Sequence, residues 1–175
     1  MDRPASPVLN VKDAEEHEST DGKHWGGTYK VLTPFLDRPG ALGVNLSRLP
    51  PGRAGCPFHY HMLDDEVFYV VSGTGVLRYG EDLYPIGPGD CISCPAGTKV
   101  AHQIASTGDE DLVYLGIGRN DPNEVCVYPD SGKVMVRGLK TVGVLEKTGY
   151  MAGEPEVPKI FALAAESGLS EGASP

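Results

Sequence analysis

Two histidines and a carboxylate lie close together between residues 52 and 73, in a pattern that suits metal binding. His59 and His61 are two residues apart, so on a β-strand their side chains point to the same side, roughly 7 Å apart at Cβ. Two imidazoles at that separation can converge on one cation, with metal–nitrogen bonds of about 2.0–2.1 Å. After a short bend, Glu66 begins an apolar run of strand character, which would place its carboxylate beside the two histidines. These three residues predict most of a metal site.

A fourth ligand is expected from a second segment. Pro95-Ala-Gly97 is a turn signal, and His102 lies on the extended run that follows it. Buried imidazoles and carboxylates each need a partner, and one cation would satisfy all four groups together. Asp64 and Asp65 compete with Glu66 as the carboxylate ligand. Carboxylates in a bend more often face solvent, so Glu66 is preferred.

The spacing of these residues resembles that of the cupin superfamily. His-x-His-x4-Glu-x6-Gly at 59–73 is followed by Gly-x5-Pro-x-Gly at 89–97 and then by a histidine, and the resemblance covers about residues 40–118. It implies an all-β fold, the double-stranded β-helix or jelly-roll barrel of antiparallel strands. It also implies one divalent metal ion per chain, held by His59, His61, Glu66 and His102.

The pattern of short strands supports an all-β barrel independently of that resemblance. Strand-like runs recur at short intervals from residue 41 to residue 116, and 23 glycines and 15 prolines supply many turns. We expect an amino-terminal arm at 1–27, the barrel with a trailing hairpin at 28–140, and a carboxy-terminal segment at 141–175. In that last segment, residues 159–167 have helical spacing and the final residues are expected to be mobile.

The strand that begins at Glu66 is apolar on both faces, which predicts that both faces are buried. If Glu66, Phe68 and Val70 point inward, then Tyr69 and Val71 point outward. An end of the chain or a second subunit would have to cover this outer face. We therefore expect a homodimer.

Composition and charge exclude several classes of partner. The formal net charge of −9 repels nucleic acid and anionic membranes. No apolar stretch approaches the ~18 residues of a membrane span. The amino terminus lacks a signal-peptide core, so a cytoplasmic location is expected. In that compartment Cys91 and Cys94 are interpreted as buried or half-buried strand thiols, despite their redox-like spacing.

The predicted site supports two functions. The first is a metal-dependent isomerase, epimerase or lyase, or a dioxygenase if the metal is iron, acting on a sugar or a hydroxy- or keto-acid. The second is a module that binds metal and a small ligand, such as a sugar-binding protein or a sensor, without turnover. Imidazole suits zinc, iron(II), manganese and nickel alike, so the sequence does not choose the metal. Lys99, Gln103 and Tyr114 lie near the second motif, and the sequence assigns none of them as the catalytic acid or base.

Overall fold

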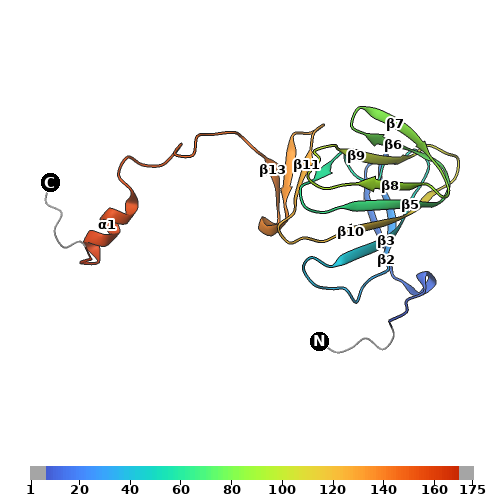
Figure 1. Ribbon diagram of the computed structural model, residues 1–175, viewed down its shortest axis with the longest axis horizontal. Helices are drawn as coiled ribbons and strands as arrows, with labels where there is room; N and C mark the ends of the chain where they lie inside the picture. Colours follow the sequence, from blue (N-terminus) through green and yellow to red (C-terminus); the bar gives the residue numbers. More distant parts are fainter. Residues whose placement is uncertain (1–6, 170–175) are drawn as a thin grey trace. The chain divides into compact units, whose positions relative to one another are not determined.

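Two antiparallel sheets enclose the hydrophobic core of the barrel in the computed structural model, which describes residues 7–169 (Figure 1). The first has six strands in the order β1-β2-β3-β10-β5-β8, and the second has three in the order β7-β6-β9. A third sheet, β13-β12-β11-β4, is built mostly from the chain that follows the barrel. The core side chains come from the inward positions of the first two sheets: Leu49, Val70, Leu77, Ile86, Ile92, Cys94, Ile104, Leu112 and Tyr114.

The strands are short, as the spacing of turn residues predicts. Their bounds are β1 Glu16–Asp21, β2 Trp25–Val31, β3 Leu42–Leu49, β4 Tyr60–His61, β5 Glu66–Ser72, β6 Gly75–Tyr79, β7 Asp82–Ile86, β8 Cys91–Cys94, β9 His102–Ser106, β10 Leu112–Arg119, β11 Val125–Tyr128, β12 Lys133–Val136 and β13 Thr141–Val144. Single 3₁₀ turns lie at Val11–Asp13 and Arg137–Leu139, and the α-helix α1 spans Lys159–Glu166. The all-β architecture with one short carboxy-terminal helix is therefore confirmed.

The described chain divides into two compact units, one ending at Leu145 and the other beginning at Glu146. The first contains all three sheets, and the second contains α1, whose side chains are mostly exposed. No helix among the described residues is long and apolar enough to cross a membrane. The ends of the expected arm and tail, residues 1–6 and 170–175, lie outside the described residues.

Part of the expected arm is paired into the main sheet. β1 pairs with β2 along its whole length, from Glu16 opposite Lys30 to Asp21 opposite Trp25. β1 is polar on both faces and mostly exposed, so its sequence carries no apolar alternation. The hairpin turn after it, with Gly22 at φ 56°, brings it against β2.

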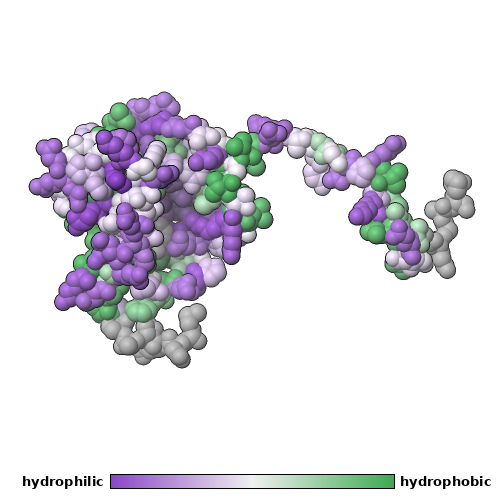
Figure 2. Space-filling model, turned by 180° about the vertical axis from the view of Figure 1, so that it is seen from behind, coloured by the Kyte–Doolittle hydropathy of each residue, from purple (hydrophilic) through white to green (hydrophobic). Residues whose placement is uncertain are grey.

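The outer face of β5 is exposed in the single chain. Val70 is completely buried, whereas Tyr69 and Val71 are 43% and 46% exposed. Val70 is therefore buried as expected, whereas no part of the described chain covers the side chains of Tyr69 and Val71. The face of the first unit seen in Figure 2 is largely hydrophilic. A homodimer that covers Tyr69 and Val71 stays a prediction.

Candidate metal centre

The three histidines reach the site from two segments that the backbone joins directly. His59 immediately precedes β4, His61 ends β4, and His102 begins β9. His59 and His102 form an antiparallel bridge. Each donates its backbone N–H to the carbonyl of the other, at 3.1 and 2.8 Å. Residues 43 positions apart in the chain are thus held side by side by two hydrogen bonds.

The three imidazoles converge on one carboxylate oxygen. Oε2 of Glu66, the first residue of β5, lies 3.0 Å from Nε2 of His102, 3.1 Å from Nε2 of His61 and 3.8 Å from Nε2 of His59. One ligand atom from each of the four residues lies within 4.8 Å of the others. His59 and His102 are buried, and His61 and Glu66 are half-buried. The structure therefore brings together all four residues that the sequence singled out, in a group that could hold a metal ion.

The surroundings of the ring nitrogens of His59 and His61 are consistent with metal binding through Nε2. Nδ1 of His59 lies 2.7 Å from the carbonyl oxygen of Pro57, to which it donates, and this leaves the lone pair of Nε2 directed at the group. Both ring nitrogens of His61 are buried and make no hydrogen bond within the described residues. Buried polar atoms without partners are costly, and a cation at Nε2 would supply one. The donor set fits a divalent cation.

The charges of the group hold Glu66 ionised. Burial opposes the charged form of Glu66, but its contacts with His102, His59 and His61 outweigh burial and hold its pKa far below the usual range. Burial lowers the pKa of His102, and its contact with Glu66 only partly offsets this. An ionised carboxylate beside a neutral imidazole is the ligand state that a divalent cation requires.

The competing acidic residues have other partners. Oδ1 of Asp65 accepts the backbone N–H of Ala96 at 2.9 Å. Asp64 is 1% exposed and pairs with Arg137, so it is not a solvent-facing bend residue. The preference for Glu66 over Asp64 and Asp65 agrees with the geometry.

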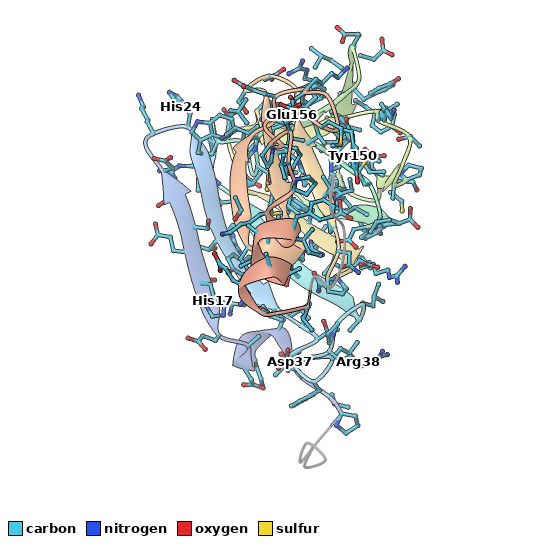
Figure 3. All side chains as sticks on the ribbon, turned by 90° about the vertical axis from the view of Figure 1, so that its left-hand side faces the viewer. His17, His24, Asp37, Arg38, Tyr150 and Glu156 are labelled. Carbon is cyan, nitrogen blue, oxygen red and sulfur yellow. The ribbon has the colours of Figure 1, made fainter. Side chains whose placement is uncertain are left out.

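The two remaining histidines lie away from this group. His17 and His24 lie on the β1–β2 hairpin (Figure 3). The ring of His17 contacts that of Tyr29, and Nδ1 of His24 lies 3.0 Å from the carbonyl oxygen of Gly52. All four cysteines are free. Cys94 is buried as expected, whereas Cys91 at the start of the same strand is exposed, so the interpretation of Cys91 as a buried or half-buried thiol is wrong.

A cavity of about 190 Å³ adjoins the group on the side of β3 and β10, with His61 and Glu66 among its lining residues. Asn45, Ser47 and Tyr114 also line it. Ser47 of β3 is directly opposite Tyr114 of β10 in the sheet register. Asn45 of β3 lies opposite Gly116 of β10 in the same register. These three residues, which we call the polar wall, offer hydrogen bonds to a ligand beside the four metal-ligand candidates.

Of the three residues that the sequence left open as acid or base, Tyr114 alone lines this cavity. Lys99 is exposed in the turn before β9. The side-chain amide of Gln103 donates to the carbonyl of Cys56 at 2.8 Å. Burial, together with the nearby Cys56 and Glu66, raises the pKa of Tyr114 well above its ordinary value. Its phenol is therefore a neutral hydrogen-bond donor at physiological pH.

Glycines keep the cavity open on the β10 side. Gly116 and Gly118 alternate with outward-pointing residues, so their Cα atoms face the cavity. A Cβ on Gly118 would lie 3.4 Å from Cγ of Glu66, and one on Gly116 would lie 3.7 Å from the ring of Phe68. Side chains at these positions would occupy the space beside Glu66.

One residue of the site, Glu124, could not be predicted from the sequence. It is completely buried, and Oε1 lies 3.3 Å from Nδ1 of His61. Glu124 sits between Asn123 and β11, in a stretch of polar residues that is typical of an exposed loop. No signal in its neighbours distinguishes it from a solvated acid.

Comparison with known proteins identifies the family. The family model described as "Cupin domain" matches residues 45–118. The solved structure of a sugar phosphate isomerase of the cupin superfamily from Silicibacter pomeroyi is 30% identical, with a TM-score of 0.66. That match covers 73% of this chain and 85% of the other.

Two curated proteins also match parts of the chain. An oxalate-binding protein of Thermotoga maritima is 33% identical over 70 residues, and auxin-binding protein 1 of Arabidopsis thaliana is 33% identical over 94 residues. These matches cover 40% and 49% of this chain, and 55% and 46% of the two relatives, so the chain spans about half the length of each. The fold, the matching family model and the likeness to a cupin isomerase along most of its length agree, and the chain belongs to the cupin superfamily.

Proposed function

We propose that this cupin binds one divalent metal ion through His59, His61, His102 and Glu66, and that it isomerises a small polar metabolite of the sugar class. The observation that carries the proposal is the convergence of three Nε2 atoms on one Glu66 oxygen beside a cavity with a polar wall. The likeness to a sugar phosphate isomerase, at 30% identity, supports the choice of reaction.

The ligand set leaves the choice among zinc, iron(II), manganese and nickel open, because imidazole suits all four. When bound, such an ion would act as a Lewis acid that polarises a carbonyl oxygen. The chain itself would bind and orient the substrate. Asn45 and Ser47 offer hydrogen bonds to hydroxyl groups, and the neutral phenol of Tyr114 can donate a hydrogen bond to a substrate oxygen.

The proposal can be tested by proton exchange. Isomerisation of an aldose to a ketose moves a proton from C2, so in D₂O the product should gain deuterium from solvent. We expect ¹H NMR to show conversion of pentose and hexose aldose phosphates to ketose phosphates, with deuterium at C1 of the ketose, when metal-loaded protein is incubated with them. His61→Ala protein, prepared in parallel, should give no exchange. If the loaded protein interconverts no aldose and ketose phosphate in the panel, the proposed reaction is wrong. Conversion without deuterium in the product would mean that the hydrogen moves from C2 to C1 as a hydride.

Binding without turnover is the second candidate, and one feature of the cavity favours it. None of the three polar-wall side chains is ionised at neutral pH, because they are an amide, a hydroxyl and a phenol. The carboxylates that also line the cavity already have partners: Asp64 pairs with Arg137, and Glu66 belongs to the group of metal-ligand candidates. Cys56, a free cysteine that is exposed, also lines the cavity. Catalysis by proton abstraction needs a base within hydrogen-bond reach of the ligand. Saturable binding of a sugar phosphate or of oxalate, with no product formed, would favour this second function.

Replacing Tyr114 with phenylalanine should weaken ligand binding or turnover while leaving metal binding intact. The change removes one hydroxyl that faces the cavity and keeps the ring that packs on Phe68. Loss of one neutral hydrogen bond costs ~0.5–1.5 kcal/mol, which is about two- to tenfold in affinity. Calorimetric titration of the metal-loaded protein with sugar phosphates would measure this. Tyr84→Phe, at an exposed position on β7, is the matched control. Equal ligand affinity in Tyr114→Phe and wild type would remove the phenol from the ligand site.

Metal affinity should fall with decreasing pH, starting at a higher pH than for an ordinary imidazole. Burial lowers the pKa of His61, but its contact with Glu66 and the charges of Glu124 and Asp64 outweigh burial, so the pKa is raised overall. Protons and metal compete for Nε2, so affinity should rise with pH until it passes this raised pKa. Below that pKa, metal affinity should fall about tenfold per pH unit for each proton that the metal must displace. Competition titrations with zinc between about pH 5.5 and 8.5 would measure the slope. A flat profile would contradict histidine ligation.

A further inference from the structure

A second group of close side chains lies behind the candidate metal ligands. His61, Asp64 and Glu124 have ligand-type atoms within 4.8 Å of one another, so they could in principle hold a cation of their own. Glu124 is 0% exposed and lies beyond residue 118, where the match to the cupin family model ends. The hydrogen bonds of this group show whether its carboxylates are free to bind a cation.

Both oxygens of Glu124 already accept hydrogen bonds from the backbone. Oε1 accepts the N–H of Met62 at 2.9 Å, and Oε2 accepts the N–H groups of Leu63 and Asp64 at 2.9 and 2.7 Å. Three successive N–H groups therefore point at one carboxylate. Such a concave arrangement of donors binds an anion. A cation placed here would face the positive ends of these bonds.

The oxygens of Asp64 are occupied in the same way. Oδ1 accepts the backbone N–H of Asp121 at 2.8 Å, and Oδ2 accepts from Nη1 of Arg137 at 2.6 Å. The same Nη1 donates to the carbonyl of Asp121 at 2.6 Å. These bonds connect the bend before β5 to Asp121, which precedes β11, and to Arg137, which follows β12. The second group is therefore a network of satisfied carboxylates, and it is not a metal site.

One atom of this network faces a metal-ligand candidate. Oε1 of Glu124 lies 3.3 Å from Nδ1 of His61, and Nε2 of the same ring lies 3.1 Å from Glu66. A small ring rotation would bring Nδ1–H into a hydrogen bond with Glu124. That bond would keep the proton on Nδ1 and leave the lone pair of Nε2 free. The carbonyl of Pro57 acts on His59 in the same way.

We propose that Glu124 is a positioning residue for the metal site: it selects the Nδ1–H tautomer of His61 and fixes the ring and the bend that follows it. The strand pairing supports this, because Cys126 of β11 lies opposite His61 of β4. The hairpin after the barrel thereby contributes to the site. The proposal rests on the metal binding in the proposed function, and not on the isomerase reaction.

The tautomer of His61 can be measured without any metal. In wild-type, metal-free protein at a pH above the raised pKa of His61, where the ring is neutral, ¹⁵N–¹H NMR should show the proton of His61 on Nδ1, as for His59. In Glu124→Gln the amide keeps the shape of the side chain but loses its charge, and His61 should shift toward a mixture of tautomers while His59 does not change. A wild-type His61 with its proton on Nε2 would overturn the proposal whether or not the variant folds.

Metal affinity gives the second readout. Loss of a carboxylate that orients a ligating histidine typically costs about 10- to 100-fold in affinity, and this is the loss expected for zinc in Glu124→Gln. Asp130→Asn, the same change at an exposed residue after β11, should bind zinc as the wild type does. A folded Glu124→Gln protein with wild-type zinc affinity would overturn the proposal. If wild-type protein binds no divalent metal at all, the proposed function fails, whereas the tautomer measurement still tests Glu124.

Discussion

Replacing His61 with alanine is expected to lower metal affinity by more than about 100-fold, beyond the upper end of what the loss of an outer carboxylate costs. His61 supplies one of the three Nε2 atoms that converge on Glu66. Its loss leaves two imidazoles for the cation and also leaves Glu124 without the ring it faces. Elemental analysis after dialysis against metal-free buffer should show stoichiometric metal in the wild type and little or none in the variant.

His24→Ala is the matched control for that experiment. His24 is exposed on the β1–β2 hairpin, its Nδ1 lies 3.0 Å from the carbonyl oxygen of Gly52, and it is not part of the four-residue group. It should retain the full metal content. Unchanged stoichiometry in His61→Ala would show that the four-residue group does not hold the metal. Equal loss in both variants would point to a general effect on folding, which circular dichroism would detect.

Gly116→Val is expected to abolish or strongly weaken ligand binding while the metal stays bound. Gly116 has no positive φ, and its Cβ would make ordinary contact with Phe68 at 3.7 Å, so the strand can accept a side chain. The remaining methyl groups would enter the cavity of about 190 Å³ beside Glu66. Forcing a ligand into filled space costs ~1–3 kcal/mol, which is about 5- to 150-fold in affinity. Titration of metal-loaded protein with sugar phosphates would measure the loss.

Gly143→Val provides the same chemical change outside the cavity. Gly143 lies on β13, and a Cβ there would have no atom within 4 Å. Its ligand affinity should equal that of the wild type. If Gly116→Val also retained wild-type affinity, the ligand would have to bind elsewhere, and the polar wall would lose its proposed role. Loss of metal in Gly116→Val would instead mean that the valine displaces Glu66.

The metal-ligand candidates could be predicted from the sequence because their geometry is local. Two histidines with one residue between them on extended backbone face the same side, and Glu66 starts the strand that returns beside them. His102 was found through the turn that precedes it. The core strands were predicted for a related reason: residues such as Val70 and Leu112 belong to apolar runs bounded by turn residues.

Features that depend on backbone partners could not be predicted. Glu124 is buried because three N–H groups from a bend about sixty residues earlier surround it, and nothing in its own neighbourhood encodes them. β1 belongs to the sheet because β2 offers it a free edge, although its own side chains are polar. The polar wall arises from register: Ser47 meets Tyr114 only when β3 and β10 are aligned.

The reciprocal backbone bonds between His59 and His102 have a consequence for the order of assembly. Small zinc modules fold only around their ion, because no site exists in the unfolded chain. Here two coordinating side chains are anchored by the main chain itself, and the apolar interior does not depend on them. Chelators should therefore strip the ion and leave a folded apoprotein, ready to be reloaded without refolding.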